Sequence, residues 1–364
     1  MSELIVNDLN IVDDSKLKQI GNPSSNGFII EVPFIKKGFT AYAALKCSTS
    51  STSDNLFYEY YVGKYFINNY LKILPCFIET YDIYAFKDEY AYNEVQGSLA
   101  NKLTKFGINI EENLEHYIDK SCNISKYICL LIQHFDNFYS LDEKLKSDYD
   151  NVKLEIFTIL YQAYYPLCFL GKTYTHYDFH TDNIALYKPF NDKQCVLMRY
   201  HRNNKVIEFK SEYIVKIIDY GRNYFNNGKL STNEFIELLY KVKPDYVSGY
   251  GYSSICAAKT NALVSTDPSQ PNMSHDLRAA IDLKYELLED NIVETIKYIY
   301  KYGTPEDMTG NTVNVTNIFN LRDALEDIIP KFVEKLEKKY GDWKVVATMD
   351  IYDDGNDFVF SYNN

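Results

Sequence analysis

The chain has 364 residues and a formal net charge of -12 at pH 7, with 46% hydrophobic and 24% charged residues. This balance excludes an intrinsically disordered chain, and the length allows one large or two modest domains. The acidic charge leaves no broad basic face, so we expect no nucleic-acid partner.

Cysteine usage and apolar segments bear on the cellular compartment. None of the seven cysteines forms a Cys-x-x-Cys pair, which argues against a disulfide framework or a zinc site. The N-terminal residues lack the basic and apolar blocks of a signal peptide. The most apolar segment, residues 156–170, is too short to span a membrane and contains Gln162 and Pro166. We therefore expect a soluble protein of a reducing, cytoplasmic compartment with no membrane partner.

Residues 16–135 predict a half of the chain that is rich in strands. Residues 1–15, before it, are polar and predict a loose arm or a capping strand. The Ser/Thr run at 48–53 can cap a helix over residues 55–70, and residues 87–125 form an insertion of weak helical character. Apolar runs predict strands at residues 17–20, 28–32, 40–47, 77–86 and 127–132.

Residues 136–345 predict a helix-rich half, followed by a tail at 346–364. In 151–170 the apolar residues alternate spacings of four and three, which indicates one buried helical face. Pro166 is expected to kink this helix or disturb its last turn, and Gly171 to end it.

Shorter elements complete the second half. Residues 195–210 predict a hairpin that turns at Asn203-Asn204. Helices are predicted at residues 232–242, 276–302 and 317–340, the last interrupted by Pro330, and strands at 214–218 and 357–361. The fold class expected from this order is α+β.

A polar loop, Thr173–Asn183, lies between the helix at 151–170 and an apolar run at 184–187. It holds two histidines, two aspartates and an asparagine. Loops between core elements are where folds commonly present reactive groups. Asp219, directly after the strand at 214–218, is a further candidate.

Phosphoryl transfer from ATP requires a lysine for the phosphates, an acid that holds the lysine, a carboxylate and an amide for magnesium, and a carboxylate for the acceptor hydroxyl. The chain supplies these groups in order: Lys46 at a strand end, Glu59 on the next helix, then Asp178, Asn183 and Asp219. The sequence therefore predicts an enzyme that uses ATP and Mg²⁺.

Three motifs resemble those of protein kinases. Ala43-Ala-Leu-Lys46 resembles the Val-Ala-Ile-Lys strand, His176-Tyr-Asp-Phe-His-Thr-Asp-Asn183 the catalytic loop, and Asp219-Tyr-Gly221 the Asp-Phe-Gly motif. The resemblance covers about residues 16–340. It implies a two-lobed kinase-like fold, with a strand-rich small lobe, a helix-rich large lobe and the nucleotide between them. The composition also resembles kinase-like proteins of large DNA viruses, for which the host cytoplasm or the virion would be the location.

The resemblance implies a role for each matching residue. Asp178 is implied as the catalytic base, Asn183 and Asp219 as magnesium ligands, and Lys46 as the contact to the α- and β-phosphates, paired with Glu59.

Further positions are implied around the nucleotide. Gly21 and Gly27 are implied to bracket the loop over the phosphates, and Gln133 and His134 to lie at the adenine-binding hinge. Asp276 is implied as a buried acid that supports the catalytic loop.

Departures from the kinase pattern leave the acceptor open. Tyr177 stands where arginine is expected, so we expect no switch by activation-loop phosphorylation. His180 replaces the loop lysine, no Ala-Pro-Glu follows Gly221, and the phosphate loop lacks its middle glycine. The leading hypothesis is a Ser/Thr kinase acting on a protein substrate. The alternatives are a kinase for small-molecule alcohols, of aminoglycoside or choline type, and an inactive kinase-like scaffold.

The same residues also have structural interpretations. Asp178 and Asn183 are good turn formers, and Glu79 competes with Glu59 as a partner for Lys46. His176 is expected to brace the loop by hydrogen bonds. Together with His180 it lacks a third clear ligand, so these histidines do not predict a metal site.

Overall fold

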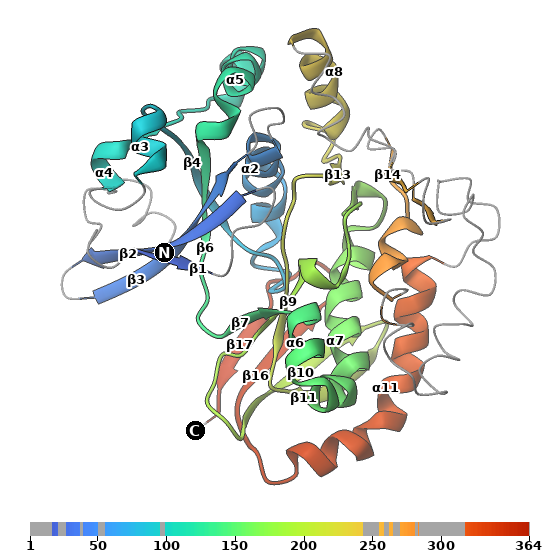
Figure 1. Cartoon of the computed structure of the whole chain (residues 1–364). Helices are drawn as coiled ribbons and strands as arrows, with labels where there is room; N and C mark the ends of the chain where they lie inside the picture. The colour runs from blue at the N-terminus through green and yellow to red at the C-terminus, as the bar shows by residue number, and fades with distance from the viewer. Residues whose placement is uncertain are drawn as a thin grey trace. The chain divides into compact units, whose positions relative to one another are not determined.

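The structure is a computed structural model whose chain forms an α+β fold divided into two compact units (Figure 1). Unit 1 comprises residues 1–68, 78–135 and 220–253, and unit 2 comprises 69–77, 136–219 and 254–364. The structure describes residues 17–20, 27–36, 39–49, 55–94, 99–242, 255–257, 262–264, 270–280, 283 and 317–363. The expected arm at 1–15 and most of the helix expected at 276–302 lie outside the described residues.

Unit 1 is built on a six-stranded antiparallel sheet of order β1-β2-β3-β6-β4-β5. Side chains of one face, such as Val32, Leu45 and Leu131, are fully buried, as expected for β-branched and aliphatic residues on a half-buried sheet. The expected insertion contributes the edge strand. The strands are β1 (Lys18–Ile20), β2 (Gly27–Lys36), β3 (Phe39–Ser48), β4 (Thr80–Phe86), β5 (Leu103–Lys105) and β6 (Ile128–Gln133).

Helices cover the rest of unit 1. Helix α2 (Asn55–Tyr65) is shorter than expected and is followed by the 3-10 turn η3 (Ile67–Tyr70). The others are α3 (Glu89–Asn93), α4 (Leu99–Lys102), α5 (Ile110–Ile124), η4 (Ser125–Tyr127) and α8 (Thr232–Val242), with the short strand β13 (Tyr224–Phe225).

Aromatic side chains join α8 to α2. The Phe235 ring lies 5.7 Å from Phe57 and 4.9 Å from Tyr58, and the Tyr58 hydroxyl donates to Asn223 O at 2.5 Å. Residues 220–253 therefore belong to unit 1. This differs from the expected organisation, which placed everything after residue 135 in the second half, because the contacts bridge segments about 170 residues apart.

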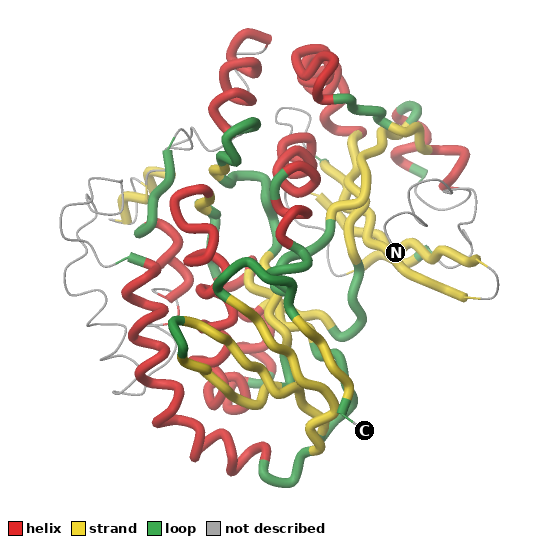
Figure 2. Tube along the Cα trace, turned by 180° about the vertical axis from the view of Figure 1, so that it is seen from behind, coloured by secondary structure: helices red, strands yellow, loops and turns green. Residues whose placement is uncertain are grey.

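Unit 2 contains a four-stranded sheet of order β11-β10-β16-β17, and Figure 2 shows helices against one of its faces. The rings of Tyr161 on α7 and Tyr200 on β10 pack 4.9 Å apart, and those of Phe157 on α7 and Phe332 on α11 pack 4.6 Å apart. The elements are α6 (Leu141–Ser147), α7 (Tyr149–Leu170), β10 (Gln194–Arg202), β11 (Lys205–Ser211), α11 (Ile318–Tyr340), β16 (Lys344–Tyr352) and β17 (Val359–Tyr362).

The predicted hairpin is confirmed, and the predicted tail is not separate. Asn203 and Asn204, with φ of 49° and 60°, form the turn between β10 and β11. This left-handed conformation is one that asparagine tolerates. Strand β16 pairs in parallel with β10 and in antiparallel with β17, so residues 346–362 are part of the unit 2 sheet. The helices continue through Pro166 and Pro330, which were expected to disturb them.

A second, three-stranded sheet of unit 2 has the order β12-β9-β7 and carries the polar loop. Its strands are β7 (Phe138–Ser140), β9 (Ile184–Tyr187) and β12 (Ile214–Ile217). Short elements near it are η5 (Gly171–Thr173), β8 (Tyr174–Thr175), η6 (Thr181–Asn183) and η8 (His275–Leu277), and β14 (Ile255–Ala257) pairs with β15 (Ala262–Val264).

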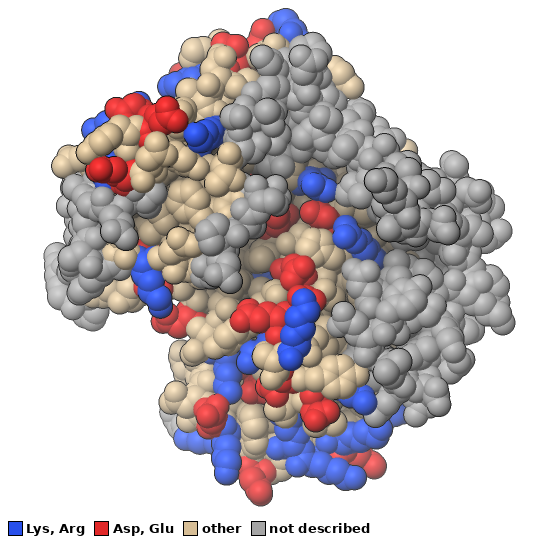
Figure 3. Space-filling model, in the orientation of Figure 1, with Lys and Arg blue, Asp and Glu red and all other residues tan. Residues whose placement is uncertain are grey.

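Acidic and basic side chains are interspersed over the described surface seen in Figure 3. Within the described ranges, every helix is too short or too polar to cross a bilayer.

Candidate active site

Unit 1 pairs the predicted lysine with the predicted acid. Lys46 lies on β3, opposite Ile29 of β2 and Leu130 of β6. Its Nζ donates to Glu59 Oε2 at 2.7 Å, and the side chains are 24% and 5% exposed, respectively. A carboxylate so deeply buried requires a charged partner. The ammonium group of Lys46 is thereby held at one position above the sheet.

Gly63 explains how α2 brings Glu59 to the sheet. A Cβ atom at Gly63 would lie 2.2 Å from Thr80 Oγ1 and 2.9 Å from Thr80 Cβ, which no real side chain allows. Glycine therefore permits α2 to approach β4 closely. Glu59 lies one helical turn before Gly63, on the same face of the helix. The close approach thus directs Glu59 toward Lys46.

The residues expected at the hinge are engaged in hydrogen bonds within unit 1. The backbone N–H of Gln133 donates to Glu79 O at 2.9 Å, and Gln133 Oε1 accepts from the Glu79 N–H at 3.3 Å. His134 Nε2 lies 2.8 Å from Glu31 Oε2. Gln133 and His134 therefore fix the end of β6 against neighbouring backbone and side chains.

Of the two glycines expected to bracket the phosphate loop, the structure describes Gly27. Gly27 opens β2 opposite Ser48, and a Cβ there would lie 2.1 Å from Cys47 O. Close pairing of two strands is therefore enough to require this glycine. Gly21 lies outside the described residues.

In unit 2, Asp276 holds the backbone of the polar loop. Its Oδ2 accepts from the His176 N–H at 2.8 Å and its Oδ1 from the Tyr177 N–H at 2.9 Å. Tyr177 has a φ of 60°, a left-handed conformation that is costly for a bulky residue. Because Asp276 is 2% exposed, its two charge-assisted bonds stabilise this bend from inside the protein.

His176 links the loop to the strand that precedes Asp219. Its Nε2 lies 2.9 Å from Ile218 O, and its Nδ1 lies 3.3 Å from the Asp178 N–H. A carbonyl only accepts, so Nε2 carries the proton and Nδ1 accepts from Asp178. Complete burial lowers the pKa of His176, so the neutral ring that this arrangement needs is favoured.

Strand pairing brings Asn183 and Asp219 to the same edge of the sheet. Ile184, at the start of β9, pairs with Ile217, at the end of β12, and the Ile218 N–H donates to Asn183 O at 3.2 Å. Asn183 Nδ2 donates to Asp178 O at 2.8 Å, which leaves Oδ1 as its side-chain atom for a cation. Asp219 has a φ of 66°. An amide oxygen and a carboxylate are ligands that suit Mg²⁺.

Arg278 contacts the side chain of Asp178. Its Nη1 donates to Asp178 Oδ1 at 3.1 Å, and the two side chains are 31% and 17% exposed. His180 Nε2 lies 3.8 Å from the same oxygen, while His180 Nδ1 accepts from the Asp182 N–H at 3.2 Å. Sequence reasoning missed Arg278, because it lies 100 residues from Asp178 and no local pattern connects them.

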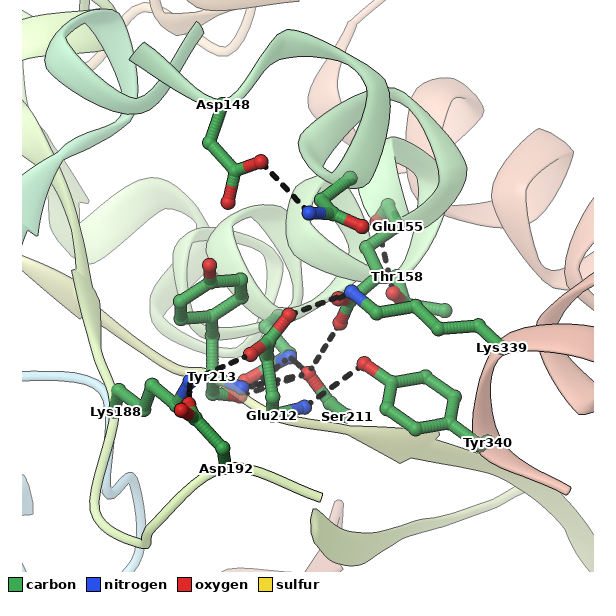
Figure 4. A network of polar contacts seen from close by, with 12 residues as sticks. Asp148, Glu155, Thr158, Lys188, Asp192, Ser211, Glu212, Tyr213, Lys339 and Tyr340 are labelled. Atoms are coloured by element: carbon green, nitrogen blue, oxygen red, sulfur yellow. Dashed lines mark hydrogen bonds and ion pairs between the residues drawn. The ribbon is translucent and has the colours of Figure 1, made fainter. Parts of the chain in front are cut away.

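A second cluster of charges is buried elsewhere in unit 2 (Figure 4). Lys339 Nζ lies 2.5 Å from both Glu155 Oε1 and Glu212 Oε1, and Lys188 Nζ lies 3.1 Å from Glu212 Oε2. Burial raises the pKa of Glu155. Burial opposes ionisation of Glu212 as well, but Lys339 and Lys188 outweigh it and lower the pKa of this carboxyl. These balanced charges join α7, α11 and the end of β11, and we assign them a structural role.

No protein-family model and no curated protein matches the chain. Unit 1 fixes a lysine on a buried glutamate. Unit 2 gathers Asp178, Asn183 and Asp219 on one hydrogen-bonded loop and strand end.

Proposed function

We propose that the protein is an ATP-dependent phosphotransferase with a two-lobed, protein-kinase-like fold, and that it phosphorylates Ser/Thr hydroxyls of a protein substrate. The observation that carries this proposal is the network at the ends of β9 and β12. There Asp276 and His176 hold the loop so that Asp178, Asn183 and Asp219 emerge from neighbouring backbone positions. The Lys46–Glu59 pair of unit 1 supports the same chemistry.

Each residue has one task in the proposed reaction. Asp178 orients the acceptor hydroxyl and takes its proton as the oxygen attacks the γ-phosphorus in line with the leaving ADP. Lys46 neutralises charge on the nucleotide phosphates, and Glu59 keeps its ammonium in place. Asn183 and Asp219 hold Mg²⁺, which offsets negative charge on the phosphates when bound. Positioning and electrostatic stabilisation supply most of the acceleration in such reactions.

His180 supports a second candidate, a kinase for small-molecule alcohols. It stands where protein kinases have lysine, and it is tied to the loop by Asp182 N–H and lies near Asn183 Nδ2 at 3.2 Å. The two candidates share donor, metal and base, and they differ only in the acceptor.

Transfer of labelled γ-phosphate from ATP tests the proposal. Wild-type protein is incubated with labelled ATP and Mg²⁺ in three separate reactions, which contain a protein mixture, choline or an aminoglycoside as the acceptor. Labelled protein supports the first candidate, and a labelled small molecule supports the second. Asp178→Ala and Asp219→Ala should each lower the transfer rate by about 100-fold or more. Asp192→Ala, which changes an exposed loop position in unit 2, should keep the wild-type rate.

Nucleotide binding is measured in parallel by thermal unfolding. A ligand that binds only the folded protein raises its melting temperature, so ATP with Mg²⁺ should do so. Absence of both the thermal shift and the transfer would contradict the proposed function. A shift without transfer to any acceptor would instead identify a nucleotide-binding scaffold.

A further inference from the structure

One short segment of unit 2 holds the polar loop at two points. Asp276, in η8, binds the main chain at His176 and Tyr177, and Arg278, two residues later, binds the side chain of Asp178. Arg278 has helical φ/ψ and is followed by the fully buried Ala279 and Ala280. The backbone of this segment is therefore held in place, and the guanidinium reaches Asp178 from a fixed position.

A carboxylate needs such a contact if it is to keep one orientation. The χ2 torsion of aspartate joins an sp³ to an sp² carbon, so its rotational preference is broad and the packing of its backbone does not fix it. The 3.1 Å bond from Arg278 Nη1 to Asp178 Oδ1 restrains this torsion. The bond is charge-assisted and both side chains are less than one-third exposed, which limits competition from water.

The same contact sets the charge beside the base. Arg278 is a permanent cation, and His180 Nε2 lies 3.8 Å from the oxygen that Arg278 binds. An acceptor that presents its hydroxyl to Asp178 has to approach this guanidinium. The guanidinium repels an ammonium group near the hydroxyl, as in choline or an aminoglycoside, and does not repel a neutral or acidic neighbour.

We infer that Arg278 is a positioning residue for the Asp178 carboxylate and that it selects a neutral or acidic acceptor over a cationic one. This inference rests on the proposed phosphotransferase function and narrows its acceptor to hydroxyl groups without a nearby cation. His180 lies farther from the same oxygen, at 3.8 Å, and so does not replace the contact that Arg278 makes.

Steady-state phosphorylation of two serine peptides tests the inference. The peptides share a core and differ in their flanks, which carry aspartate in one and lysine in the other. Arg278→Ala should lower kcat by about 10-fold or more, with KM for ATP unchanged within about 2-fold, because the base is misoriented and nucleotide contacts are intact. Arg278→Lys should recover part of this loss. Arg199→Ala, an exposed arginine paired with Glu208 on the β10–β11 hairpin, should behave as wild type.

Two further readouts separate positioning from a structural role. Added methylguanidinium should restore activity to Arg278→Ala and have no effect on Arg199→Ala. The wild type should prefer the acidic peptide, and Arg278→Ala should lose this preference. Wild-type kcat in Arg278→Ala, or loss of activity that neither lysine nor methylguanidinium restores, would overturn the inference while the proposed function stands. Absence of transfer by the wild type itself would overturn the proposed function and this inference with it.

Discussion

Lys216 is a buried lysine on β12, three residues before Asp219. Its Nζ donates to Pro75 O at 2.5 Å. Burial lowers the pKa of Lys216 to about 8 from its usual 10.5, because an ammonium group loses hydration inside the protein. The protonation of Lys216 therefore affects the stability of β12, the strand that precedes Asp219.

The lowered pKa has a calculable effect on stability. The drop from 10.5 to about 8 corresponds to about 3 kcal/mol at 1.36 kcal/mol per pKa unit. The unfolded chain binds the proton of Lys216 more tightly than the folded protein does. The free energy of unfolding is therefore lowered by this amount below about pH 8, and it recovers as the pH rises toward about 10.5. Between about pH 7 and about pH 9.5, the wild type should gain about 2 kcal/mol in free energy of unfolding relative to Lys216→Met.

Urea unfolding followed by the fluorescence of Trp343 measures this gain. Trp343 is the one tryptophan of the chain, and its ring lies 4.9 Å from Tyr340 in unit 2. Comparison with Lys216→Met cancels the titration of the tyrosines and cysteines that both proteins share, except for Cys76, which interacts electrostatically with Lys216. Methionine leaves Pro75 O without its donor, at a cost of about 1–3 kcal/mol at either pH, so the change with pH is the informative quantity.

The control is Lys172→Met, which removes an exposed lysine of unit 2. This variant should differ from the wild type by the same small amount at both pH values. An unchanged difference between wild type and Lys216→Met across the pH range would refute the reasoning, because it would mean that the buried ammonium is not disfavoured by burial.

Three other changes test the scaffold of the site. Asp276→Ala leaves two loop N–H groups unpaired and should cost about 3 kcal/mol by Trp343-detected unfolding; a loss under about 0.5 kcal/mol would contradict the assigned role. Gly63→Ala places a Cβ against Thr80 and should cost about 1–3 kcal/mol in thermal unfolding, whereas Gly107→Ala, with nothing within 4 Å, should not. The lowered pKa of His176 means that stability is complete above about pH 6.5 and falls below it; His176→Gln should flatten this dependence, and an unchanged slope would count against it.

Local signals in the sequence predicted a large part of the fold. The hairpin at Asn203-Asn204, helix α7 and strands β1, β2, β3, β4 and β6 of unit 1 follow from turn residues and hydrophobic period, which act over a few neighbours. Strand β5 was not predicted, because it lies in the stretch expected to be weakly helical. The Lys46–Glu59 pair was predicted from chain order, and the structure places the two side chains in contact.

Long-range packing was not accessible from the sequence. The parallel pairing of β16 with β10, the packing of α8 on α2 and the contact of Arg278 with Asp178 each join segments 100 residues or more apart. Nothing in the composition of one segment identifies its partner, because burial of an apolar face specifies no particular neighbour. The expected interruption at Pro330 was wrong, because α11 runs unbroken from Ile318 to Tyr340, whereas α7 ends before Gly171 as predicted.

The order of strands in the unit 2 sheet has a consequence for biosynthesis. Strand β16 lies between β10 and β17, yet it follows β10 by about 150 residues in the chain. During translation, β10 and β11 leave the ribosome before residues 344–352 are synthesised. One edge of β10 therefore stays unpaired until β16 has formed. Unit 2 is therefore obliged to fold late, at high contact order. Until β16 is paired, that edge of β10 presents unpaired backbone N–H and C=O groups, which can pair with another chain.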